Sequence, residues 1–152
     1  MPTYTDLWDA AFEAAPADLD NVSDGASEIR QLKQAVRERI DIFSRGGTLL
    51  NDIGGVTAVN IAVWRATVPC IVTAVKGYRV GGTGATVNAR LNGASNHLAT
   101  ALSLTSESVW TDGGAVQNVT YAVGDTLEIM VVTVTGVVTQ LAVQVDFQRA
   151  DQ

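Results

Sequence analysis

The chain has 152 residues, of which 47% are hydrophobic and 17% charged, and its net charge at pH 7 is −6. This composition can bury a core for one ordinary domain, which excludes a wholly disordered protein. The acidic balance argues against nucleic-acid binding through clustered lysines and arginines. The single cysteine, Cys70, has no intramolecular disulfide partner, and its apolar surroundings VPCIV predict a buried, unreactive side chain.

Residues 1–23 are predicted to form an arm that anchors the protein to a partner. Leu7, Trp8 and Phe12 have the spacing of one face of a short amphipathic helix, which Pro16 would end. Two interpretations stay open, since Trp8 could dock on a partner or fold back onto its own chain. The arm lacks the basic and apolar stretches of a signal peptide, so we expect synthesis in a cytoplasm without membrane insertion.

Residues 24–45 are predicted to form an amphipathic oligomerisation helix. Gly46 and Gly47 follow it, as expected after a helix C-terminus. Its apolar residues recur every three or four positions, which puts them on one narrow stripe: Ile29, Leu32, Val36, Ile40 and Phe43. Because a lone helix of this length is marginal in water, the stripe needs a partner.

Two partners for this stripe are considered. Three copies of the helix could pack around a threefold axis as a homotrimer, with β-branched residues at the first heptad position. However, Arg39 interrupts the heptad after about two turns, so the helix would also suit the surface of another protein.

Residues 46–57 are expected to be a Gly-rich linker, and residues 58–152 an antiparallel β-sandwich, jelly-roll-like, which makes the fold mainly β. Apolar residues here alternate with polar ones, and turn signals recur every 8–12 residues or so. Strands are expected near residues 59–64, 71–80, 86–91, 102–104, 116–121, 126–134 and 139–149. The last two are predicted to pair as a hairpin, with Glu128 and Asp146 on its outward face.

Catalytic and metal-binding signals are weak. The only histidine, His97, has no nearby cysteine, histidine or carboxylate with metal-ligand spacing, and we expect it to be an exposed loop residue. No nucleophile motif accompanies it. We therefore expect no enzyme, no metal and no cofactor.

Five residues are candidates for recognition of a partner's surface. Trp64 is predicted on the face opposite Val59, Ile61 and Val63, and the others lie in loops. Exposed tryptophan beside polar groups can stack on a sugar ring or anchor a protein contact, although it can also cover the end of a sandwich. The candidates are Trp64, Asn96, His97, Trp110 and Asp112.

The N-terminal part resembles a known module. Trp8, the string Pro16-Ala17-Asp18, Ser23, Gly25 and the run IRQLKQAVRERI occur in the order and spacing of the pattern W…PxD…SxGxxxIRxLKxAIRERL. That pattern begins many tailed-bacteriophage fibre and decoration proteins. More loosely, YRVGGTGATVNARLNG, VGDTLEIMV and TGVVTQLAVQVDF resemble small sandwich domains of phage virion proteins.

This resemblance implies a non-enzymatic virion protein, made in the bacterial host cytoplasm and bound to phage capsid or tail proteins. One compact C-terminal domain without a repetitive shaft favours a short trimeric head fibre, a spike or a capsid decoration protein. The alternative is a tail fibre or adhesin module that binds a host-surface glycan or protein.

Overall fold

The computed structural model describes residues 29–34, 36, 41–50 and 59–150. The chain divides into two compact units, Met1–Asp41 and Ile42–Gln152. In the first unit, residues 29–34 and 36 are helical, as the periodicity predicts. The residues predicted to anchor the protein, Leu7, Trp8 and Phe12, and Ile40 of the predicted stripe lie outside the described residues. Within the described part, no helix is long and apolar enough to cross a membrane.

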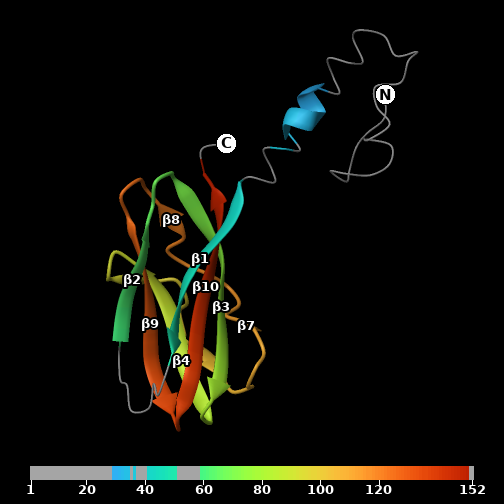
Figure 1. Cartoon of the computed structure of the whole chain (residues 1–152). Helices are drawn as coiled ribbons and strands as arrows, with labels where there is room; N and C mark the ends of the chain where they lie inside the picture. Colours follow the sequence, from blue (N-terminus) through green and yellow to red (C-terminus); the bar gives the residue numbers. More distant parts are fainter. Residues whose placement is uncertain (1–28, 35, 37–40, 51–58, 151–152) are drawn as a thin grey trace, which may run out of the picture. The chain divides into compact units, whose positions relative to one another are not determined.

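The described residues of the second unit form two antiparallel sheets (Figure 1). Sheet A has the order β1-β10-β3-β7, with β8 also paired to β3. Sheet B has the order β2-β9-β4-β5, with β6 also paired to β4. The strands are β1 (Ile42–Leu50), β2 (Val59–Arg65), β3 (Cys70–Gly81), β4 (Gly84–Leu91), β5 (Ser95–Asn96), β6 (Leu102–Leu104), β7 (Thr111–Asp112), β8 (Thr120–Tyr121), β9 (Thr126–Thr135) and β10 (Val138–Arg149).

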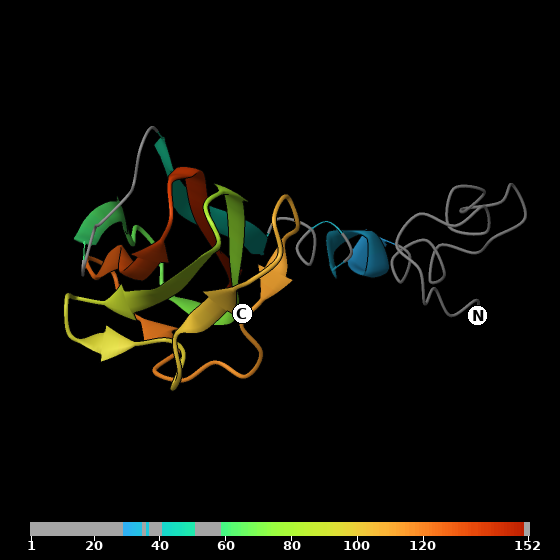
Figure 2. The ribbon, with the colours of Figure 1, turned by 90° about the horizontal axis from the view of Figure 1, so that it is seen from below.

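The strand order is that of a jelly roll. When β5 is grouped with β6, and β7 with β8, the ten strands reduce to eight positions. The first position then pairs with the eighth, the second with the seventh, the third with the sixth and the fourth with the fifth. Figure 2, turned by 90° from Figure 1, looks along the strands. The predicted mainly-β, jelly-roll-like sandwich is confirmed.

The core fills the space between the two sheets. Its largest fully buried side chains include Tyr121, Phe147, Leu127 and Leu141, which come from both sheets. Cys70 is part of this core, as predicted, and its burial, together with the negative charge of Asp125, raises the thiol pKa to about 11. A thiol held in this way stays protonated and unreactive at neutral pH.

The predicted hairpin of the last two strands is wrong, because β9 belongs to sheet B and β10 to sheet A. Their apolar residues do meet, but across the core and not side by side in one sheet. Alternation of apolar and polar residues identifies the inward face of each strand and does not identify the strand that pairs with it. The outward positions of Glu128 and Asp146 are confirmed, since each forms an ion pair outside the core.

The helix predicted to run to residue 45 and the linker predicted to begin at residue 46 are corrected by β1. Phe43 lies on this strand and not on the helical stripe. Its ring stacks on Phe147, with centroids 5.4 Å apart and planes 13° apart, and meets the edge of Trp64 at 5.7 Å. The Phe43 side chain, which the periodicity assigns to a helix, therefore packs partly buried against the β-core.

Gly46 and Gly47 lie within β1, at two positions where a side chain would not fit. A Cβ added to Gly46 would lie 2.1 Å from the Val143 carbonyl oxygen of the neighbouring strand. A Cβ added to Gly47 would lie 2.9 Å from side-chain carbons of Ile129 and Val63, in sheet B. Glycine inside a strand marks such close approaches, so this pair serves packing and is not a flexible joint.

Arg79 is a buried guanidinium that the sequence does not single out. It is 2% exposed, and all of its described hydrogen bonds go to backbone carbonyls at one end of the sandwich. Nε donates to Leu104 at 2.9 Å, and Nη2 donates to Thr105 at 3.0 Å. Nη1 donates to Gly82 at 3.0 Å and also to Gly81.

These carbonyls belong to connections that change sheet. Gly81 and Gly82, both with positive φ, turn the chain from β3 in sheet A to β4 in sheet B. Leu104 and Thr105 begin the passage from β6 in sheet B to β7 in sheet A. One side chain thus donates hydrogen bonds to backbone carbonyls of both crossings.

We predict that Arg79→Met lowers the free energy of unfolding by about 3 kcal/mol or more, because methionine fills the space but leaves these carbonyls without donors. Urea unfolding followed by circular dichroism measures the change. Arg90→Met is the matched control, since Arg90 pairs with Glu128 at 2.9 Å in a partly exposed position. It should cost about 1 kcal/mol or less. Equal losses in the two variants would contradict the role given to Arg79.

Candidate functional site

The helical segment carries an exposed apolar stripe. Ile29, Leu32 and Val36 are 56%, 40% and 44% exposed. Their spacing of three and four residues puts them on one helix face. Isolated apolar side chains on a surface are common, but three on one face of a short helix form a patch that water disfavours. Of the predicted oligomerisation set, these three lie on the described helical segment, whereas Phe43 lies on β1.

Trp64 does not lie on the outer face, where the alternation puts it. A register shift between Ala62 and Trp64 interrupts the pairing of β2 with β9. The bulge turns both Val63 and Trp64 toward the core. The indole packs against Phe147, with ring centroids 5.1 Å apart, so its role is structural.

His97 is fully buried, at 0% exposure, which overturns the predicted exposed loop histidine and excludes it from a recognition surface. Its backbone N–H donates to Ala89, and its carbonyl accepts from Gln117. Its ring Nε2 lies 2.8 Å from the hydroxyl of Tyr121, and Nδ1 lies 3.3 Å from the carbonyl oxygen of Gln117.

These partners define the protonation of the imidazole. A carbonyl can only accept, so Nδ1 carries the proton and Nε2 accepts from Tyr121. Burial lowers the pKa of His97, since a charged ring would lose its water, and burial raises the pKa of the Tyr121 hydroxyl. The pair is therefore neutral at pH 7 and serves as a polar bridge inside the core.

Asn96 also has a structural role. It lies in β5 and is half-buried. Its backbone carbonyl accepts from the side-chain amides of Asn118, at 2.8 Å, and Gln117, at 3.3 Å. Together with His97 it holds residues 117–118, just before β8, to β5, and a recognition role for the Asn96 side chain stays a prediction.

Trp110 and Asp112 are the two recognition candidates that lie together on the surface. Trp110 is 50% exposed, and its ring is 5.4 Å from that of Tyr78 at a tilt of 40°. Asp112 is exposed on β7, opposite Lys76 of β3, and accepts a 2.8 Å hydrogen bond from the Gly114 backbone. Both residues line hollows on the outer face of sheet A.

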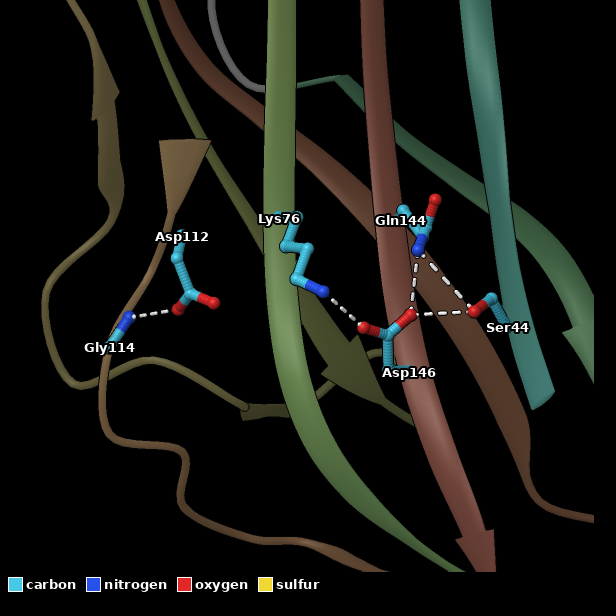
Figure 3. Close-up of polar contacts among 6 residues, drawn as sticks. All are labelled: Ser44, Lys76, Asp112, Gly114, Gln144 and Asp146. Atoms are coloured by element: carbon cyan, nitrogen blue, oxygen red, sulfur yellow. Dashed lines mark hydrogen bonds and ion pairs between the residues drawn. The ribbon is translucent and has the colours of Figure 1, made fainter. Parts of the chain in front are cut away.

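A polar network crosses this outer face beside them (Figure 3). Lys76 donates to Asp146 at 2.6 Å, and Asp146 also accepts from Ser44 at 2.6 Å and from Gln144 at 2.7 Å. Burial alone would raise the pKa of Asp146, but these hydrogen bonds and the lysine charge lower it below its usual value. The hydrogen bond and charge of Asp146 in turn raise the pKa of Lys76.

Four neighbours of Trp110 do not stand out in the sequence, namely Ser44, Lys76, Tyr78 and Gln144. Lys76 and Tyr78 are on β3, Gln144 is on β10, and Ser44 is on β1, which the sequence pattern assigns to a helix. Only the pairing of β10 with both β1 and β3 brings these outward positions together. Among the described residues, no group of three or more histidines, cysteines and carboxylates could hold a metal ion.

No protein-family model and no curated protein matches the chain. Among solved structures, the chain is similar to one in the cyanophage Pam1 capsid asymmetric unit, with 17% identity and a TM-score of 0.43 over 72% of this chain and 86% of that chain. It is also similar to the protein FLHE, with 17% identity and a TM-score of 0.35 over 71% of this chain and 96% of that chain. Likenesses this weak carry no argument about function.

We predict that His97 makes the protein less stable in mild acid. Its folded pKa is lowered, so the unfolded chain binds a proton more readily. Stability is then full above the unfolded pKa of about 6.5 and falls as the pH decreases toward the folded pKa, by at most about 1.4 kcal/mol per pH unit. Chemical denaturation between pH 7.5 and about 5 measures this slope.

The matched variant is His97→Gln, which keeps hydrogen-bonding groups but does not titrate. Its free energy of unfolding should change less than that of the wild type over the same pH range. Parallel pH profiles for the two proteins would contradict the assignment of the slope to His97.

Proposed function

We propose that the chain is a non-enzymatic structural protein of a phage virion, a short trimeric head fibre or spike or a capsid decoration protein. In this proposal the arm and helix hold it to capsid or tail proteins, and the β-sandwich is displayed outward. The observation that carries the proposal is the exposed apolar stripe of Ile29, Leu32 and Val36. It is supported by the resemblance of residues 8–40 to the N-terminal module of phage fibre and decoration proteins.

The stripe is the kind of surface that a protein partner covers, because three aliphatic side chains on one face of the described helical segment are exposed. Burying each of these side chains against a partner would contribute on the order of 1.5–3 kcal/mol. Self-association around a threefold axis and attachment to a larger assembly both provide such burial.

A structural role also accounts for the ionisable groups of the sandwich. Asp146 binds Lys76, and Glu128 binds Arg90. Asp125 accepts from the Asn92 side chain, which with the Ala122 backbone bond lowers its pKa. Each of these groups stabilises a turn or a strand pair. By analogy of fold, jelly rolls also occur in viral capsid and lectin domains.

The second candidate function is binding of a host-surface glycan or protein. The observation that favours it is the half-exposed Trp110 on the outer face of sheet A. Display on a virion and recognition of a host surface are compatible in one chain.

We predict that the full-length protein has about three times its 16.0 kDa chain mass in solution and that the double variant Ile29→Asp/Val36→Asp has the mass of one chain. Two carboxylates in the stripe would have to be buried without partners, which prevents helix association. Size-exclusion chromatography with light scattering measures both masses.

Lys33→Glu is the control, because it changes charge on the same helical segment outside the stripe. Its mass should equal that of the wild type. The thermal unfolding midpoint of the sandwich should be similar in the monomeric variant, apart from any contribution of assembly. A wild-type mass of one chain, or an unchanged mass in the double variant, would refute self-association through the stripe.

A further inference from the structure

The outer face of sheet A is hollowed into a groove of about 590 Å³. Its floor lies over β1 and β10, where Gly46 and Ala142 carry little or no side chain. The pairing places Gly46 opposite Gln144, and Ala142 opposite both Thr48 and Tyr78. Small residues in adjacent rows of a sheet leave room that larger neighbours border. The volume is within the range of small-molecule sites.

One wall of this groove is aromatic. Tyr78 stands on β3 beside the Ala142 position, and Trp110 reaches it from the segment just before β7. The two rings contact each other at 5.4 Å, which braces the indole while half of it stays exposed. An aromatic ring held in this way offers an apolar face to a ligand at little cost in side-chain entropy.

The rest of the groove border supplies side-chain hydrogen-bonding groups that have no partner among the described residues. Among the described residues, no side-chain hydrogen bond forms at the Tyr78 hydroxyl, the Trp110 N–H, the Gln140 amide or the Thr48 hydroxyl. The Gln144 amide donates to Asp146 and Ser44, which fixes its orientation and leaves its carbonyl oxygen without a donor in this part of the chain.

The cations beside the groove are engaged elsewhere. Lys76 is neutralised by its 2.6 Å ion pair with Asp146, and both are in the network beside Gln144 (Figure 3). The Arg45 guanidinium lies over the rings of Phe43 and Trp64, and Asp112 adds a negative charge at the second hollow. An anionic ligand would find no unpaired cationic cluster here, and the chain as a whole is acidic, so the surroundings favour a neutral polar ligand.

We propose that this groove binds a neutral pyranose sugar. The apolar C–H face of the ring would stack on Trp110, and its hydroxyls would bond to Gln140, Gln144 and Tyr78. A pyranose combines one apolar face with a rim of donors and acceptors, which matches an aromatic wall bordered by amides and hydroxyls. This ligand class is proposed for the sandwich alone, so it does not depend on the helix or on the virion role.

The test is a titration of the full-length protein with neutral probes, namely maltotriose, lactose, L-rhamnose and N-acetylglucosamine with its trimer. Saturable quenching of tryptophan fluorescence and shifts of the Gln140 and Gln144 side-chain amide signals in NMR spectra are expected for at least one of them. 3′-Sialyllactose is the anionic comparator and should bind more weakly than lactose. Comparison of N-acetylglucosamine with its trimer distinguishes a free sugar from a unit of a polysaccharide.

Trp110→Ala should lower the affinity for the sugar by about tenfold or more, because the stacking face is lost. Gln144→Leu, which retains the approximate size of the side chain, should also lower the affinity for the sugar while the aromatic wall stays in place. Val109→Ala is the matched control, because Val109 is exposed beside Trp110 and does not line the groove. Unfolding midpoints verify that each variant is folded.

Failure of every neutral probe to bind, or equal affinities for wild type and Trp110→Ala, would overturn the proposal. Binding of a peptide in the groove without any sugar binding would also overturn it and would assign the groove to a protein partner. The Ile29→Asp/Val36→Asp variant should bind sugar like the wild type, so loss of assembly and loss of sugar binding are separate outcomes.

Discussion

The fold depends on the need of every jelly-roll chain to pass repeatedly from one sheet to the other. At each passage the ladder of hydrogen bonds stops, and carbonyls near the core require other donors. At one end of this sandwich Arg79 supplies those donors to Gly81 and Gly82 of one crossing and to Leu104 and Thr105 of another. A planar guanidinium has five N–H groups in a fixed arrangement, which suits several fixed acceptors better than an ammonium would.

Because the crossings and the core are complete within the sandwich, its outer faces are available for other roles. The outer face of sheet A combines small residues over its centre with an aromatic pair and a fixed polar network at its border. The described helical segment, in contrast, exposes aliphatic side chains. The two surfaces differ in chemistry, which is why we propose assembly for the helical segment and sugar recognition for the sandwich.

The parts of this architecture that depend on local patterns could be predicted from the sequence. Alternation identified most long strands and the inward side of β9 and β10, and the turn signals indicated a jelly-roll-like sandwich. The pairing of β10 with β1 and β3 is a non-local choice, and neither the groove nor the neighbours of Trp110 follow without it. Phe43 continues the helical spacing by coincidence, while the reason for β1, close packing at Gly47, lies in residues far away in sequence. The bulge at Trp64 and the burial of His97 have no local signal.

The pairing of Ile42 with Gln148 means that the sandwich receives its chain and releases it at the same end. The turns that join β3 to β4 and β9 to β10 lie at the other end, about 30 Å away for strands of this length. This geometry makes the sandwich a natural frame for peptide display. Foreign residues inserted at Gly136 and Val137, the latter already exposed, would lie far from Ile42, whereas a fusion after Arg149 would emerge beside Ile42.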